Sequence, residues 1–159
     1  MFNRYFTQFS GIALAVSLVC GAGCTRKQQD ASDPKQRLNA YISQSFDVRK
    51  VDDRDSLMAY LTGPAKVRLA AWSPEQFREA FIESKREFVK LVFSEIKPVS
   101  PTETNITYEL TYIDKGKSSN AKVTHKKLCQ LVQDQGGWFI KDVRSIKELV
   151  EYQNEMSLP

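Results

Sequence analysis

Cys129 and His125 are the side chains best suited to nucleophilic or metal chemistry, and His125 is the single histidine of the chain. A catalytic cysteine needs a base within hydrogen-bond reach. Four residues apart in a strand, the two side chains share a face but lie about 13 Å apart, so we do not expect a catalytic pair. Cys129 stands in the apolar stretch 128–132 and is expected to be a small buried side chain. His125 lies in a charged stretch and is expected to face solvent, and one histidine argues against a zinc site.

Carboxylates offer no better catalytic set. General acid–base chemistry needs a base near the substrate and a donor for the developing oxyanion. Glu109 alternates with Tyr108 and Tyr112 along a strand pattern, so it points away from their hydroxyls. Asp142 stands near a strand end, where a turn or salt-bridge role is expected. The sequence therefore predicts no catalytic residue, no metal and no cofactor, and a protein that is not an enzyme.

Aromatic side chains with polar tips are the candidate pocket residues. They come from two helical stretches and from strands that should lie close together: Tyr41, Tyr60, Tyr108, Tyr112 and Trp138. Such a set could line a site for a small apolar ligand. The alternative is that the rings fill the core and leave their hydroxyl groups at its rim.

Lysines form the main charged feature of the surface, at positions 115, 117, 122, 126 and 127. They could meet anionic lipid headgroups or cell-wall polymers, or form an ordinary solvated strand surface. The net charge of +4 is too small, and the basic and acidic residues too interleaved, to indicate nucleic-acid binding.

The start of the chain follows the plan of a secretory signal. Arg4 provides a positive charge, residues 9–19 are apolar or small, and this run is about half the ~20 residues that a membrane-spanning helix needs. Ala22 and Gly23 then precede Cys24. This arrangement resembles the lipobox of bacterial lipoproteins, which has small residues at the two positions before the modified cysteine.

The resemblance implies that residues 1–23 are removed and that Cys24 carries the lipid, with residues 24–32 as a polar tether. Gly21 departs from the pattern, because Leu is usual at that position. Several acyl chains on one residue anchor a protein stably, since each buried methylene contributes about 0.8 kcal/mol. The residue after Cys24 is Thr25 and not Asp. By analogy with lipoprotein sorting in Gram-negative bacteria, this favours the outer membrane, with the domain facing the periplasm. The alternatives are an ordinary signal with a soluble periplasmic product, or an uncleaved and weak membrane anchor.

Periodicity and capping signals predict the elements of a domain at 33–159. Helices are expected first and strands second, followed by a short helix from Ser145 with Glu148 in its capping box. The expected helices are 33–50, 53–62, 66–72 and 74–85, and the expected strands are 87–97, 105–114, 121–133 and 138–143. Helices segregated from a meander of antiparallel strands indicate an α+β fold.

This order of elements, with the ending around Asp134, Gly136, Gly137, Trp138 and Asp142, resembles small bacterial lipoproteins with a nuclear-transport-factor-2-like (cystatin-like) cone. The resemblance implies N-terminal helices packed on a curved four-stranded antiparallel sheet, with a short C-terminal helix. The cone hosts enzymes, ligand binders and assembly domains alike.

The first functional hypothesis is a lipid-anchored envelope protein with a non-catalytic binding or scaffolding domain. Its partner would be an envelope protein or a small apolar ligand, besides the membrane itself. The alternative is a cone-fold isomerase or hydrolase that acts on a small apolar substrate through a buried carboxylate. A structural homodimer that uses the sheet face is a third possibility.

Overall fold

A computed structural model describes residues 33–116 and 121–152. The predicted signal segment, the lipid acceptor Cys24, the tether 24–32 and Lys117 lie outside the described residues. Within the described ranges, no helix has the length and apolar content needed to cross a bilayer.

Helices occupy the first half of the domain: α1 (Pro34–Phe46), η1 (Val51–Asp53), α2 (Arg54–Met58), α3 (Gly63–Ala70), α4 (Pro74–Phe77) and η2 (Arg78–Glu83), the last a π-helical continuation of α4. Side chains cap two of these helices at their first turn. The Asp33 side chain accepts a hydrogen bond from the backbone of Lys35 at 2.9 Å, and Ser73 and Gln76 form a reciprocal capping box. The first helix ends earlier than expected, at Phe46.

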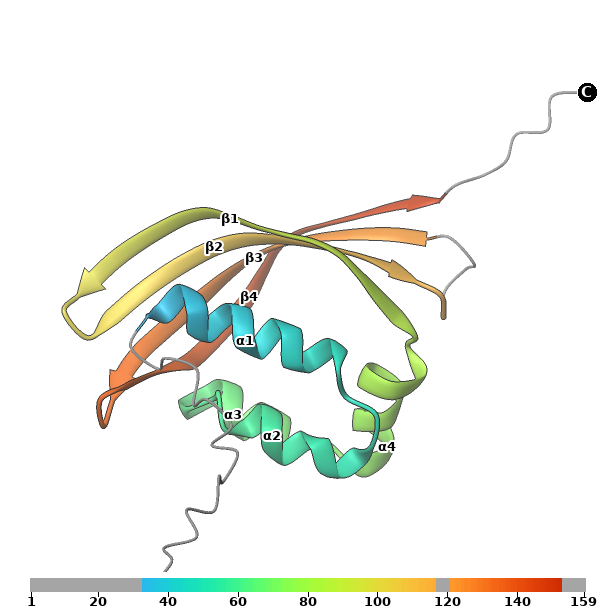
Figure 1. Cartoon of the computed structure of the whole chain (residues 1–159), viewed down its shortest axis with the longest axis horizontal. Helices are drawn as coiled ribbons and strands as arrows, with labels where there is room; N and C mark the ends of the chain where they lie inside the picture. Colours follow the sequence, from blue (N-terminus) through green and yellow to red (C-terminus); the bar gives the residue numbers. More distant parts are fainter. Residues whose placement is uncertain (1–32, 117–120, 153–159) are drawn as a thin grey trace, which may run out of the picture.

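Four strands follow, β1 (Arg86–Ser100), β2 (Glu103–Asp114), β3 (Ala121–Asp134) and β4 (Gly137–Tyr152), in the antiparallel order β1-β2-β3-β4. Figure 1 shows the sheet bending over the helices, which lie together on one of its faces. The predicted α+β class, with N-terminal helices on a curved four-stranded antiparallel sheet, is therefore confirmed.

The core lies between this concave face and the helices. Ile106, Tyr108, Leu110 and Tyr112 alternate along β2 and are all buried, as the period of two predicts. The helices contribute further side chains that are fully buried, Leu38, Leu57 and Phe77.

The predicted C-terminal helix is wrong, because β4 continues through that stretch to Tyr152. Ser145 and Glu148 belong to this strand rather than to a capping box. The distal half of β4 pairs with the first half of β3, for example Val150 with Val123. Val123 is completely buried, so its part of β3 needs a neighbouring strand to bond its backbone groups.

Candidate functional site

An apolar cleft of about 180 Å³ opens between the helices and the middle of β4. We call it the Trp72 cleft, and it is lined by Tyr41, Leu61, Ala65, Arg68, Leu69, Trp72, Phe81 and Val143. An apolar cavity of about 150 Å³ holds one benzene molecule. The Trp72 cleft therefore has room for one aromatic or branched aliphatic group.

Backbone hydrogen bonds fix the floor of the cleft. The chain between α2 and α3 runs beside β4, where the Thr62 amide donates to the Ile140 carbonyl at 2.9 Å and the Ile140 amide donates to the Tyr60 carbonyl at 2.9 Å. This short parallel bridge, centred on Leu61, ties the start of α3 to the sheet. The walls of the cleft thus belong to elements that are held together.

Trp72 forms one wall at the end of α3 and is 37% exposed. Its carbonyl accepts a hydrogen bond from the Arg54 guanidinium at 2.9 Å. Its ring lies 5.9 Å from that of Phe81, which stacks on the buried Phe77 at 4.8 Å. A second hollow on the surface, lined in part by Glu79, also borders the indole. Trp72 is therefore a large aromatic side chain that is anchored in place and still accessible.

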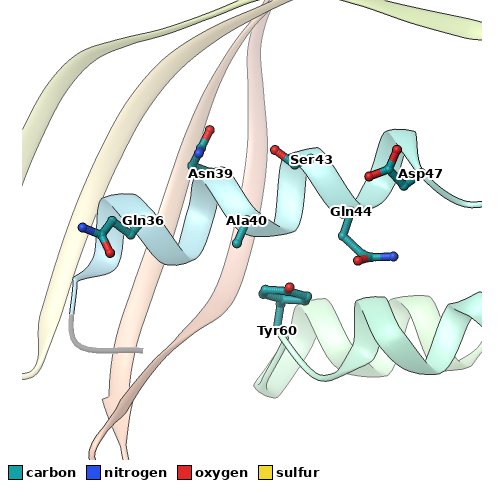
Figure 2. Close-up of a pocket in the computed structure, with 7 residues that line it drawn as sticks. All are labelled: Gln36, Asn39, Ala40, Ser43, Gln44, Asp47 and Tyr60. Atoms are coloured by element: carbon teal, nitrogen blue, oxygen red, sulfur yellow. The ribbon is translucent and has the colours of Figure 1, made fainter. Parts of the chain in front are cut away.

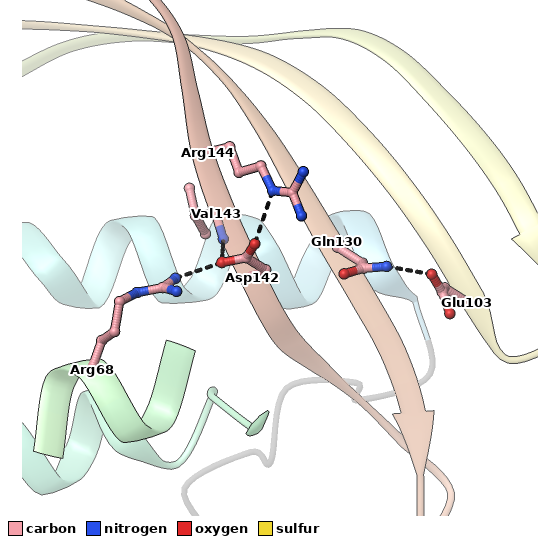
Figure 3. A network of polar contacts seen from close by, with 6 residues as sticks. All are labelled: Arg68, Glu103, Gln130, Asp142, Val143 and Arg144. Carbon is pink, nitrogen blue, oxygen red and sulfur yellow. Dashed lines mark hydrogen bonds and ion pairs between the residues drawn. The ribbon is translucent and has the colours of Figure 1, made fainter. Parts of the chain in front are cut away.

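A charged network borders the cleft at Arg68 (Figure 3). Asp142 on β4 accepts hydrogen bonds from the Arg68 guanidinium at 2.5 Å, from Arg144 at 3.0 Å and from the Val143 amide at 3.0 Å. The hydrogen bond from Arg68, then that from Arg144, lowers the pKa of Asp142 below its usual value. This carboxyl group is therefore a structural anion and not a buried acid, which agrees with the predicted salt-bridge role.

His125 and Lys127 differ from expectation because both lie on the concave face. The His125 side chain is 13% exposed rather than solvent-facing. Its Nε2 is 3.1 Å from the Tyr112 hydroxyl, and its Nδ1 is 3.5 Å from the Glu148 carboxylate. Odd-numbered β3 residues face the helices, as the burial of Cys129 confirms, and these two residues follow the same alternation.

The predicted lysine cluster is thereby divided. Burial, and next the Arg86 guanidinium, lower the pKa of Lys127. The other described lysines of the set each lie near a carboxylate: Lys115 at 2.6 Å from Glu87, Lys122 at 3.2 Å from Glu151 and Lys126 at 3.8 Å from Glu109. Paired charges of this kind favour the solvated-surface interpretation over a basic binding patch.

The five predicted pocket residues do not gather around one cavity. Tyr41 lines the Trp72 cleft, and its ring lies 6.1 Å from that of Tyr60. Tyr108, Tyr112 and Trp138 are core residues, at 3%, 7% and 9% exposure. Three of the five therefore fill the core, which was the alternative interpretation.

Tyr60 lines a different hollow, a polar groove of about 370 Å³ along α1. Figure 2 shows that Asn39 and Ser43 point away from the Tyr60 ring, while Gln44 extends beside it on the other side of the helix. Because these side chains do not converge, the groove has no evident binding geometry.

The sequence reasoning missed Arg68 and Trp72 as site residues. One signal was available, a tryptophan placed directly before the Ser73 capping box, where two helices must meet at an angle.

Among residues 33–116 and 121–152, no group of three or more His, Cys, Asp or Glu side chains is arranged to hold a metal ion.

No family model and no curated protein matches the sequence. Among solved structures, a SEC-C motif containing protein from Rhodopseudomonas palustris is similar, with 12% identity, a TM-score of 0.53 and coverage of 75% of this chain and 83% of that chain. The intermembrane space region of chloroplast protein ARC6 has 14% identity, a TM-score of 0.47 and coverage of 71% and 95%. VirB8 from Agrobacterium tumefaciens has 12% identity, a TM-score of 0.41 and coverage of 74% and 93%. At these identities the likeness concerns the fold alone, and the chain shares an α+β fold with the SEC-C motif containing protein.

Proposed function

We propose that this chain is a lipid-anchored protein of the bacterial cell envelope whose domain is a non-catalytic binding module for a partner protein. Cys24 would carry the lipid and hold the domain at the outer membrane, facing the periplasm. The observation that supports a binding module is the Trp72 cleft, an apolar hollow bordered by an accessible tryptophan and by Arg68.

The size of the cleft favours a protein over a small molecule. Pockets for drug-sized ligands usually enclose about 300–1,000 Å³, whereas this cleft encloses about 180 Å³. That volume suits a single apolar side chain inserted from a partner surface. Trp and Arg are also the residue types that most often dominate the binding energy of protein interfaces. The Arg68 side chain is 55% exposed and could bond a partner carbonyl or carboxylate at the rim.

The predicted anchor restricts where that partner can be. A tether covering residues 24–32 spans at most about 30 Å even when fully extended. A domain on such a tether reaches only partners close to the membrane surface. The proposal therefore joins two parts, an anchor that sets the location and a cleft that binds a neighbour in the envelope.

Each part has its own test in cells that produce the full chain. For the anchor, Cys24→Ser should move the protein from the membrane fraction to the soluble periplasmic fraction, and retention in the membrane would contradict lipid anchoring. For the cleft, chemical cross-linking in intact cells should give an adduct of defined mass that Trp72→Ala abolishes. Val67→Ala is the matched control, because Val67 lies on α3, close to Trp72 in the chain, at 67% exposure and does not line the cleft. Equal adduct yields in the two variants would refute the role of the cleft.

The second candidate is a cone-fold isomerase or hydrolase for a small apolar substrate, and the Tyr112–His125–Glu148 chain is the observation that favours it. A carboxylate that orients an imidazole toward a hydroxyl is a common way to activate that hydroxyl. The full chain would then turn over aryl esters or enolisable ketones, and His125→Ala would abolish turnover while Trp72→Ala would preserve it. Turnover with that pattern would replace the binding proposal.

A further inference from the structure

Strand β1 forms an edge of the sheet and carries unusual apolar exposure. Among the described strands, β2 is its only neighbour in the sheet. Its large apolar side chains are nevertheless exposed: Phe88 by 48%, Val89 by 49%, Val92 by 37%, Ile96 by 46% and Val99 by 54%. A long edge strand with exposed apolar side chains is a template for pairing with another strand. None of these residues lines the Trp72 cleft, so the feature is separate from the proposed binding site.

The outer face of β1 has a regular charge pattern that the primary sequence conceals. Two of the three irregularities in its pairing with β2, between Phe88 and Lys90 and between Phe93 and Glu95, shift the alternation within residues 87–97. The pairing with β2 shows which β1 residues share a face, because the partners of those residues are every second residue of β2. In strand order the outward-facing positions are Glu87, Lys90, Val92, Glu95 and Lys97, opposite Ile113, Thr111, Glu109, Thr107 and Asn105.

This pattern is complementary to its own reverse. If a second β1 lies antiparallel with the two-fold axis at Val92, Lys90 faces Glu95 of the copy and Glu87 faces Lys97 of the copy. Val92 then faces Val92. An axis at Lys90 or at Glu95 would instead set that charge against its own copy, which is destabilising for directly opposed residues.

The helix-facing side of β1 agrees with the same register. There Phe88 faces Ile96 of the copy, and Leu91 faces Phe93 of the copy, so apolar side chains cover one another. Phe88 already packs edge-on against Phe46 of its own chain, with ring centroids 5.5 Å apart, which holds its ring in place for this contact. Glu87, which lies 2.6 Å from Lys115 in its own chain, would gain a second cation in Lys97 of the copy.

We infer that the partner of β1 is a second copy of this chain, paired antiparallel about Val92, so that the two four-stranded sheets become one continuous sheet. Charge complementarity selects this register, and the apolar helix-facing side is compatible with it. The dimer would carry two Trp72 clefts and two anchors. It can exist whether or not those clefts bind another protein, so its failure and that of the proposed function are distinguishable.

A charge-exchange experiment tests the register on the full chain in mild detergent, with sedimentation equilibrium as the readout. Lys90→Glu and Glu95→Lys each place two like-charged pairs across the axis, and each should raise the dimer dissociation constant about tenfold or more. The double variant should dimerise like the parent, and the two single variants should form a heterodimer when mixed. Lys66→Glu makes the same charge change as Lys90→Glu at an exposed position of α3, and it should leave the dimer dissociation constant unchanged.

A cysteine scan tests the axis directly in the envelope. Opposed residues of an antiparallel pair have Cα atoms about 4.5–5.5 Å apart, within the range of about 4.4–6.8 Å that a disulfide requires. Under oxidising conditions Val92→Cys should give a disulfide-linked dimer. Val67→Cys on α3 should give no more covalent dimer than the parent chain does. A monomeric parent at all concentrations, single variants that dimerise as well as the parent, or equal cross-linking at the two cysteine positions would each overturn the inference.

Discussion

Replacing Asp142 by Asn should measure how strongly α3 is held to β4. The substitution keeps the side-chain shape but removes the charge that Arg68 and Arg144 share. Both arginines are largely solvated, with side chains 55% and 75% exposed, while the carboxylate is 16% exposed. Solvent therefore screens each pair to about 0.5 kcal/mol, and the loss of both should lower the free energy of unfolding by about 1 kcal/mol at pH 7.

The effect should depend on pH in one direction. The two arginines lower the pKa of Asp142 in the folded protein, so the folded state holds its proton less tightly than the unfolded state. The stabilisation is fully present above the ordinary aspartate pKa of about 3.9 and is lost as the pH falls through the lower folded-state value. The parent and Asp142→Asn should therefore converge in stability in strong acid.

Urea unfolding of the full chain, followed by circular dichroism between pH 2 and pH 7, measures this difference. Asp134→Asn is the control, since this exposed aspartate lies at the end of β3. A variant as stable as the parent at pH 7 would show that the network does not stabilise the domain. An unchanged gap in strong acid would show that the effect does not come from the carboxylate charge.

Three further predictions concern stability and are measured by thermal or denaturant unfolding. Phe77 is fully buried, so Phe77→Ala should cost about 3–5 kcal/mol, and a cost below 1 kcal/mol would contradict its core role. Ser73→Ala removes one half of the capping box and should cost about 1 kcal/mol, whereas Ser73→Asp should retain most of the stability. Lys127→Met removes an ammonium group whose pKa is lowered by burial and by Arg86, and should raise Tm by about 2–4 °C. Because the pKa of Lys127 is lowered in the folded state, the parent gains stability as the pH rises. The Tm difference between Lys127→Met and the parent should therefore shrink toward pH 10. A Tm difference that does not change with pH would argue against a cost of burying the charge.

The elements that local rules determine could be predicted from the sequence. Caps at Asp33 and Ser73 depend on residues within one helical turn, and the structure contains both. The alternation in β2 depends on neighbouring residues alone, and it assigned Tyr108 and Tyr112 correctly to one face. Local rules could not show whether that face borders a cavity or a packed core, because this depends on helices distant in the chain.

The site depends on contacts between distant segments. The Trp72 cleft needs α3, η2 and β4 at their final distances, and the Arg68–Asp142 pair spans 74 positions. The position of His125 was more accessible to sequence reasoning. Alternation with the buried Cys129 already indicates the concave face, whereas the charged residues around His125 favour a solvent face. A strand on a curved sheet can bring polar side chains inward when other polar groups meet them there, as the Tyr112 hydroxyl meets His125.

The end of β4 shows why a local pattern can fit the wrong element. Ile146, Leu149 and Val150 have helical spacing, but in β4 they do not share one face, because Val150 pairs with the buried Val123 and the adjacent Leu149 pairs with Thr124. Ile146 and Leu149 are left 55% and 47% exposed, while Val150 packs against the core. A helix here would gain about 1 kcal/mol from its capping box. It would also leave the backbone of β3 around the buried Val123 without a partner, at about 1–3 kcal/mol for each unsatisfied group. Two or more such groups outweigh the cap, so pairing with β3 determines the structure of the C-terminal segment.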